Sequence, residues 1–393
     1  MKRWLFCAIL SFLLPVHASA AGSFPHSNWP SLDADAAHSD SNLQEKTLTA
    51  ANVLRLKVKW ALPIPTQSYP VVSNGKVYLP ITARHKIHAR AVDALSGKTV
   101  HTFPQDAMGG LSVISDGLVV AGHLLQLLDP LSGEKLQQMP APLGLSGGTY
   151  LDPTSDTKVL LVGYATTTRS STSNLYTVDP TTGTILHTFS SATAQGTIGS
   201  HGRVLTVTRA GAAFYDEVSG RTVALQASVF GPWFAGSTLS YTVASIGKKS
   251  VYLLAYDGTG QRVWKRAIGP PYVVDSWPHA VTPNQVFVER VRPAVGVESL
   301  DAFTGAIIWN RSIPNVQRMA EANGVLYVLT YALGEPVKVV ALKAATGKVI
   351  GVIGLSSAYY AYPEQNDLMV ANGMLFIRAV GPNNVQELVA LGL

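Results

Sequence analysis

Short apolar segments alternate along the chain with polar turns. Residues 76–79, 325–328 and 374–377 are rich in β-branched and aromatic side chains, and each segment follows an Asn-Gly pair. Runs of this length and composition, bounded by turn residues, are typical of β-strands, and Asn-Gly is typical of tight hairpin turns. The pattern predicts an all-β chain.

A second turn recurs with the form Asp-x-x-Ser/Thr-Gly. The aspartate accepts hydrogen bonds from amides two or three residues further on, and the glycine supplies the positive φ that reverses the chain. Each copy therefore predicts a hairpin between two strands. The complete copies begin and end at Asp93 and Gly97, Asp129 and Gly133, Asp179 and Gly183, Asp216 and Gly220, and Asp301 and Gly305. The turn from Asp257 to Gly260 is one residue shorter, and in the turn that ends at Gly347 a lysine replaces the aspartate.

The spacing of these turns predicts the architecture. Successive turn glycines lie 36 to 50 residues apart, with about four strands in each interval, as in the blades of a β-propeller. The last strand, 387–391, ends where another hairpin is due, and residues 54–62 carry a matching apolar alternation that includes Trp60. We expect a propeller of about eight four-stranded blades over residues 54–393, with the last blade closed by an N-terminal strand that hides the open sheet edges.

The first residues predict export. Lys2 and Arg3 precede an apolar run over residues 4–16, and Ala18-Ser19-Ala20 has the small-x-small form of a signal-peptidase site. We expect a signal peptide over residues 1–20, cleavage near Ala20, and a secreted or periplasmic protein. The polar residues 21–53 have no periodicity and predict an extended N-terminal arm. The apolar run is too short for a membrane span, and no later run is long enough.

Composition narrows the function classes. The chain is 47% apolar and 14% charged, as expected of a protein with a packed core. Its formal charge of +6 includes Lys2 and Arg3 and is not gathered in a basic run, so nucleic-acid binding gains no support. The single cysteine, Cys7, lies in the predicted signal, which excludes disulfides, cysteine catalysis and a lipid anchor from the mature chain. We expect a monomer.

The repeat resembles that of the PQQ-repeat propellers, the superfamily of the quinoprotein alcohol dehydrogenases and of the propeller subunit of outer-membrane protein assembly. The resemblance rests on the Asp, Ser/Thr and Gly hairpin and on apolar-Trp strands such as Val263-Trp264 and Ile308-Trp309. It also rests on an opening segment that contains Trp29-Pro30, His38, Asn42, residues 47–53 and residues 56–60.

The resemblance implies two functions. Many enzymes of this superfamily use PQQ with calcium beside a vicinal cysteine pair, and some carry a c-type haem. The mature chain has no cysteine and no haem-attachment motif, and no local motif matches the calcium ligands or the catalytic aspartate. We therefore assign no catalytic residue, metal ligand or cofactor. We expect a binding or scaffolding protein with a protein or polysaccharide partner in the cell envelope or outside the cell. The alternative is a PQQ-dependent oxidoreductase of an alcohol or a sugar.

Candidate ligand contacts come from residues that open the blades. Aromatic residues stand beside prolines at Tyr69, Trp233, Trp277 and Tyr362. They would either ring one mouth of the central channel and stack on a sugar or planar ligand, or pack between blades while the proline begins the innermost strand. Arg290 and Arg292 lie two apart and so share one face of a strand. They would either bind a carboxylate or phosphate, or point into solvent.

Overall fold

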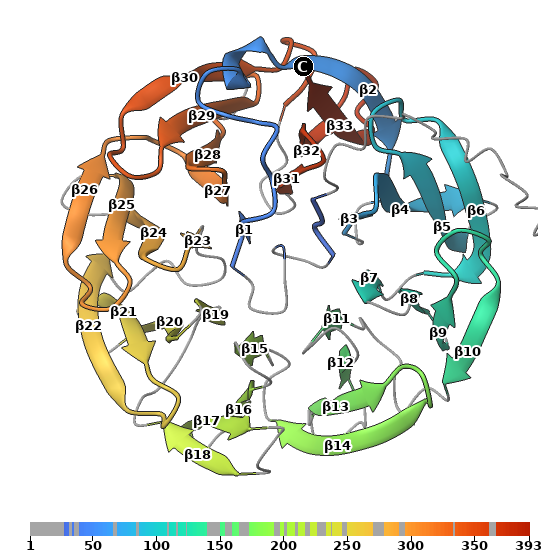
Figure 1. Ribbon diagram of the computed structural model, residues 1–393, viewed down its shortest axis with the longest axis horizontal. Helices are drawn as coiled ribbons and strands as arrows, with labels where there is room; N and C mark the ends of the chain where they lie inside the picture. Colours follow the sequence, from blue (N-terminus) through green and yellow to red (C-terminus); the bar gives the residue numbers. More distant parts are fainter. Residues whose placement is uncertain are drawn as a thin grey trace, which may run out of the picture.

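The chain forms a ring of eight β-sheets around a central axis (Figure 1). The computed structural model describes residues 27–30, 34, 39–65, 69–83, 86–107, 110–114, 117–122, 124–139, 150–153, 159–164, 173–191, 197–199, 203–208, 211–216, 221–225, 233–236, 238–245, 250–269, 279–290, 295–332, 335–360 and 367–393. Within these residues each sheet has four antiparallel strands, and one sheet carries a fifth strand. The predicted all-β propeller of about eight blades is confirmed.

The first four blades run in chain order, each from its innermost to its outermost strand. Blade 1 contains β3 (Val71–Ser73), β4 (Lys76–Ala83), β5 (Lys86–Asp93) and β6 (Thr99–Asp106). Blade 2 contains β7 (Gly110–Ile114), β8 (Gly117–Ala121), β9 (Leu125–Leu128) and β10 (Lys135–Met139). Blade 3 contains β11 (Tyr150–Pro153), β12 (Val159–Tyr164), β13 (Ser173–Asp179) and β14 (Thr184–Ser191). Blade 4 contains β15 (Thr197–Gly199), β16 (Arg203–Thr208), β17 (Gly211–Asp216) and β18 (Thr222–Leu225).

The remaining blades complete the ring. Blade 5 contains β19 (Trp233–Ala235), β20 (Ser240–Ser245), β21 (Val251–Tyr256) and β22 (Arg262–Gly269). Blade 6 contains β23 (His279–Val281), β24 (Gln285–Arg290), β25 (Gly296–Asp301) and β26 (Ile307–Arg311). Blade 7 contains β27 (Val316–Ala322), β28 (Val325–Thr330), β29 (Lys338–Lys343) and β30 (Val349–Gly354), with β1 (Ser41–Asn42) as its fifth strand. Blade 8 contains β31 (Leu368–Ala371), β32 (Met374–Val380), β33 (Gln386–Gly392) and β2 (Lys57–Pro63), and the 3₁₀ helix η1 (Val53–Arg55) precedes β2.

The repeated turn joins the third and fourth strands of a blade and has the predicted hydrogen bonds. Asp93 Oδ1 accepts from the amide of Ser96 at 2.8 Å and from its hydroxyl at 2.7 Å, and Gly97 has a φ of +67°. The same acceptor role is taken by Asp129, Asp179, Asp257 and Asp301. Positive φ angles recur at Gly133, Gly183, Gly260, Gly305 and Gly347. Asp216 ends β17, whereas Gly220 lies outside the described residues.

Neighbouring blades are joined by tryptophans of the outermost strands. Trp264 of blade 5 donates its indole N–H to the carbonyl of Ala302 in the blade 6 turn at 3.1 Å. Trp309 and Trp60 make the same bond to the following turns, at 2.8 and 3.0 Å. The ring of Trp264 lies against Gly305, so that turn needs glycine for contact as well as for its backbone angle.

Gly305→Ala is expected to lower the free energy of unfolding by about 2–3 kcal/mol. A β-carbon at this position would lie 2.7 Å from Cε3 of Trp264, and the φ of +69° disfavours alanine in addition. Gly324→Ala is the matched control, because Gly324 has a φ of +75° but no atom within 4 Å of the added carbon. Urea denaturation should show a loss of only about 1 kcal/mol for the control. Equal losses in the two variants would contradict the tryptophan contact.

The two ends of the described chain close the ring as predicted. β2 pairs antiparallel with β33, and Trp60 lies opposite Ala390. At the seam between blades 7 and 8, Gly351 of β30 pairs with Ala341 of β29, and it occupies the position that Trp309 has in blade 6. Leu54 from η1 fills the space that a side chain would need there, since an added β-carbon at Gly351 would lie 2.7 Å from Leu54 Cδ1.

The apolar core lies between blades rather than at the axis. Buried clusters join blades 1 and 2, blades 2 and 3, blades 5 and 6, and blades 6 and 7, and the largest joins blades 7, 8 and 1 with the N-terminal arm. Trp29 and Leu48 of the arm are 2% and 0% exposed within this last cluster. Throughout the described ranges, every helix falls short of the length and hydropathy that crossing a membrane requires.

Candidate functional site

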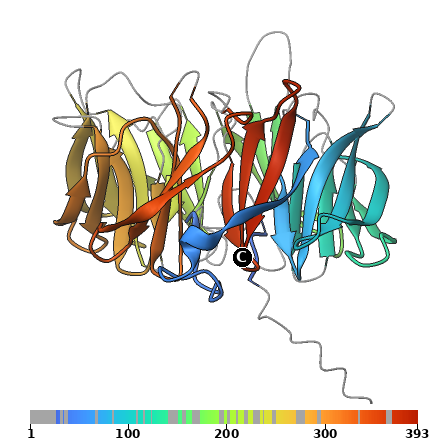
Figure 2. The same ribbon diagram turned by 90° about the horizontal axis from the view of Figure 1, so that it is seen from above.

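The inner turn of a blade, between its first and second strands, and the outer turn, between its third and fourth strands, lie on the same face of the ring. The amide of Ala94 in the outer turn of blade 1 donates to the carbonyl of Gly75 in its inner turn, and Ala344 and Gly324 repeat the bond in blade 7. We call this side the turn face, its end of the central channel the turn mouth, and the opposite end the loop mouth. Figure 2 shows the described N-terminal segment on the turn face.

The N-terminal arm crosses the turn mouth and pairs with the innermost strands. Trp29 and Val72 of β3 exchange two backbone hydrogen bonds of 2.7 and 2.8 Å. The carbonyl of Pro30 accepts from Val113 of β7 at 2.8 Å. Further along, the carbonyls of Ser39 and Asp40 accept from β23 and β27, and β1 continues parallel to β27 (Figure 1). The arm therefore covers inner sheet edges of several blades.

Two buried carboxylates fix the arm at this position. Glu45 is 1% exposed, and its Oε2 accepts from the hydroxyl of Ser27 at 2.7 Å and from the amide of Gly373 at 2.9 Å. Glu321 of β27 accepts from the hydroxyl of Ser41 at 2.8 Å. Burial raises the pKa of Glu321, partly offset by its hydrogen bonds. These contacts hold the arm to blades 7 and 8 through side chains as well as through backbone.

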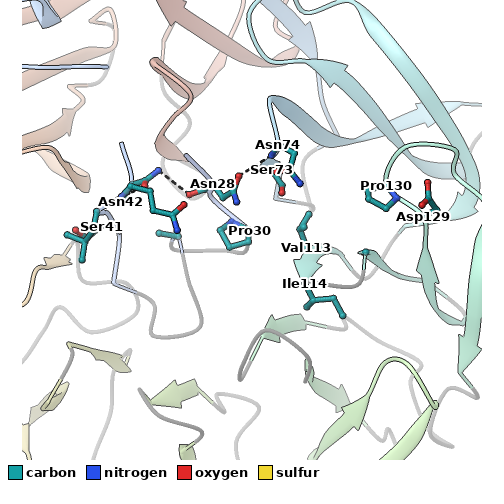
Figure 3. A pocket seen from close by; sticks show the side chains of 14 residues that line it. Asn28, Pro30, Ser41, Asn42, Ser73, Asn74, Val113, Ile114, Asp129 and Pro130 are labelled. Carbon is teal, nitrogen blue, oxygen red and sulfur yellow. Dashed lines mark hydrogen bonds between the residues drawn. The ribbon is translucent and has the colours of Figure 1, made fainter. Parts of the chain in front are cut away.

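A cavity of about 750 Å³ opens at the turn mouth between the arm and blades 1 and 2 (Figure 3). The arm contributes Asn28, Asn42 and Gln44, which bring amide groups to its wall. Blade 1 contributes Ser73 and Asn74 from the inner turn, and blade 2 contributes Val113, Ile114, Asp129 and Pro130. The site is thus assembled from three segments that are distant in sequence.

Some of the residues predicted as ligand contacts are described by the structure, and these lie near the loop mouth. Tyr69 precedes β3, on the side of that strand away from the turn, and Arg290 ends β24. Trp233 begins β19, but its side chain lies outside the described residues, as do Trp277, Arg292 and Tyr362 entirely. A ring of aromatics around one mouth therefore stays a prediction.

Arg290 and Arg378, near the loop mouth, are each paired with a buried carboxylate. Arg290 Nη1 lies 3.3 Å from Glu298, which also accepts from Arg266 Nε at 3.2 Å. Arg378 Nε lies 2.8 Å from Asp367, and the Arg378 guanidinium carbon is 5.4 Å from the Tyr69 ring centroid. The ring of Tyr69, which precedes blade 1, therefore packs against an ion pair of blade 8.

The described residues do not supply the donor set for PQQ and calcium. A carboxylate-bearing quinone needs cations, and calcium needs several oxygen ligands. Arg290 and Arg378 are engaged by Glu298 and Asp367. Within the described ranges no three His, Cys, Asp or Glu residues are gathered as a metal site would require. No chemical step is therefore assigned to this cofactor.

Glu289→Gln is expected to stabilise the protein above pH 7 and to leave it unchanged near pH 4. Burial raises the pKa of Glu289 to about 7. The folded state then holds a proton that the unfolded state releases, so the wild type loses stability as the pH rises from about 4.5 to 7. Glutamine cannot ionise, which should give a gain of about 2 kcal/mol at pH 8 after solvent screening is allowed for.

Denaturation at pH 4 and pH 8 measures this difference. Glu335→Gln is the matched control, because Glu335 is exposed in a surface ion pair with Lys338. A pH-independent effect of Glu289→Gln would contradict the raised pKa.

The arm-lined cavity was not predicted from the sequence. The arm has no strand periodicity, and its polar residues predict solvent contact. One available signal was the isolated Trp29, because a tryptophan within a polar segment is seldom fully solvated. The sequence interpretation also placed the candidate site at the blade openings, which lie at the opposite mouth.

Comparison with known proteins bears on the fold. No family model and no curated protein matches the sequence. A quinohaemoprotein alcohol dehydrogenase of Pseudomonas putida aligns with a TM-score of 0.62 and 11% identity, over 93% of this chain and 80% of that one. A europium-containing methanol dehydrogenase aligns at 0.59 and 12%, over 93% and 98% of the two chains. The computationally designed Ika8 protein aligns at 0.59 and 13%, over 84% and 98%. At these identities the similarity shows a shared propeller fold and carries no function.

Proposed function

We propose that this protein is an exported, non-catalytic binding propeller whose binding surface is the turn face. The observation that carries the proposal is the turn mouth itself, where the arm and two blades line an open cavity of about 750 Å³. Rigid concave sites with convergent polar groups are typical of ligand binding. Arg290 and Arg378 near the loop mouth, by contrast, are paired with Glu298 and Asp367.

Exposed apolar residues on the turn face support the same proposal. Leu131 follows the cavity residue Pro130 and is 67% exposed, and Leu43 of the arm is 54% exposed. Leu95 and Phe303 occupy the position of Leu131 in the turns of blades 1 and 6 and are also exposed. A partner seated at the turn mouth would bury Leu43 and Leu131, which lie at or next to the cavity.

Site-specific photo-crosslinking tests the proposed binding surface. A benzophenone amino acid at Leu131 should give covalent adducts in the living host when irradiated. The matched control is Val100, which is 50% exposed on the outermost strand of blade 1. Adducts at Leu131 but not at Val100 are expected. No adduct at Leu131, or equal adducts at both positions, would contradict the proposal.

Reconstitution tests the enzyme alternative. The purified protein is incubated with PQQ and calcium, desalted, and assayed for dye reduction with alcohols and sugars. We expect no retained quinone absorbance and no dye reduction. Retention of the quinone together with turnover would replace the binding proposal by a dehydrogenase.

A further inference from the structure

The turn-mouth cavity has polar groups that the fold itself does not use. Asn28 Oδ1 accepts from the amide of Asn74 at 3.0 Å, but its side-chain N–H groups make no hydrogen bond within the described residues. The same holds for the side-chain amides of Gln44 and Asn74 and for the hydroxyl of Ser73. Ser73 is 3% exposed and lies in the lining of the cavity.

Among the residues that the structure describes, the lining of the cavity is almost without charge. These residues include one carboxylate, Asp129, and no lysine, arginine, histidine or glutamate. Asp129 Oδ1 already accepts from the amides of Leu131 and Ser132 and from the Ser132 hydroxyl, at 2.9, 2.6 and 2.9 Å. These hydrogen bonds, led by the backbone amide of Ser132, lower the pKa of Asp129. An anionic ligand would meet a fixed negative charge, and a cationic ligand would meet only a carboxylate that the turn already uses.

The remaining wall is apolar. Pro30, Val113, Ile114 and Pro130 contribute apolar side chains to the lining (Figure 3). A ligand that fits this wall has one apolar face and one set of groups that both donate and accept hydrogen bonds. The amide and hydroxyl side chains have the same two capacities.

The sheet edges beside the cavity argue against a peptide strand. A peptide that added to β3 or β7 would need their inner-edge backbone groups. Those of Val72 and Val113 are bonded to Trp29 and Pro30 of the arm. Recognition at this site therefore falls to side chains.

We propose that the turn-mouth cavity binds a neutral saccharide. Its hydroxyls would pair with the groups of Asn28, Gln44, Ser73 and Asn74, and a sugar ring face would lie on the proline and isoleucine wall. This inference rests on the proposed binding function and names the class of ligand at the same surface.

Binding to defined oligosaccharides tests the inference. The purified protein is titrated calorimetrically with neutral gluco-, galacto-, manno-, xylo- and N-acetylglucosamine oligosaccharides, with an oligogalacturonate as the anionic comparison and a neutral glycine-serine peptide. At least one neutral saccharide should bind, and the oligogalacturonate and the peptide should not. Asn74→Gly and Gln44→Ala should each weaken binding about tenfold, as expected for one lost hydrogen bond.

Asn384→Gly is the matched control, because Asn74 and Asn384 both have positive φ and Asn384 lies in the β32–β33 turn. It should leave the affinity unchanged. The inference is overturned if no neutral saccharide binds, if the peptide or the oligogalacturonate binds instead, or if Asn74→Gly and Gln44→Ala have no effect. If the saccharide inference fails in any of these ways, photo-crosslinked adducts at Leu131 would still support the turn face as the binding surface. The binding surface itself is contradicted only when Leu131 gives no adducts.

Discussion

Replacing Trp60 by alanine is expected to lower the free energy of unfolding by about 3–5 kcal/mol. Trp60 is 8% exposed, and its ring packs 5.9 Å from that of Phe376. Its indole N–H donates to Ala94 in the turn of blade 1 at 3.0 Å. The variant loses apolar burial, a ring contact and a buried hydrogen bond. The loss falls on β2, the strand that joins the N-terminal part of the chain to β33.

Two controls separate closure of the ring from local packing. Val58→Ala changes an exposed residue of the same strand and should cost little. Trp309→Ala removes the equivalent contact between blades 6 and 7 and should cost as much as Trp60→Ala. Only Trp60→Ala should also speed hydrogen exchange in β33, because β2 is its outer partner. Unchanged exchange there would contradict the role of Trp60 in closure.

Replacing Arg378 by methionine is expected to cost about 3–5 kcal/mol of stability. Arg378 and Asp367 have side chains that are 2% and 6% exposed, with Nε and Oδ2 2.8 Å apart. Removing the arginine leaves the Asp367 carboxylate buried without its counter-charge. The free-energy cost of that unpaired charge is larger than the stability that the intact ion pair contributes. Tyr69 also loses the cation above its ring.

The double variant Arg378→Met with Asp367→Leu tests this explanation. Because it removes both charges, it should recover most of the lost free energy in urea denaturation. A double variant that is as unstable as Arg378→Met alone would show that packing, rather than the unpaired charge, causes the loss.

The fold could be predicted because its determinants are local. An aspartate such as Asp301 and a glycine such as Gly305 fix a turn within five residues, by hydrogen bonds and a positive φ that need no distant partner. Repetition of that turn gave the blade count. The incomplete last repeat, together with Trp60, gave the closure by β2.

The candidate site could not be predicted in the same way, because it depends on contacts between distant segments. Nothing around Asn28 or Gln44 in the sequence indicates that the arm lies across the channel beside Asn74 and Pro130. The contact positions between blades also vary in residue type, with His101 against Gly133, Val223 against Gly260 and Gly351 against Leu54. A pattern based on tryptophan alone misses these.

The path of the arm also sets the order in which the molecule can be completed. Ser41 bonds to a residue 280 positions later, Asn42 to one 328 positions later, and Ser27 to one 345 positions later. Synthesis proceeds from the N-terminus, and contacts between remote segments form late. The arm therefore cannot reach its final position until blades 7 and 8 have formed, and until then it is accessible to chaperones and proteases. In a product truncated before β27, the arm would stay accessible to chaperones and proteases permanently.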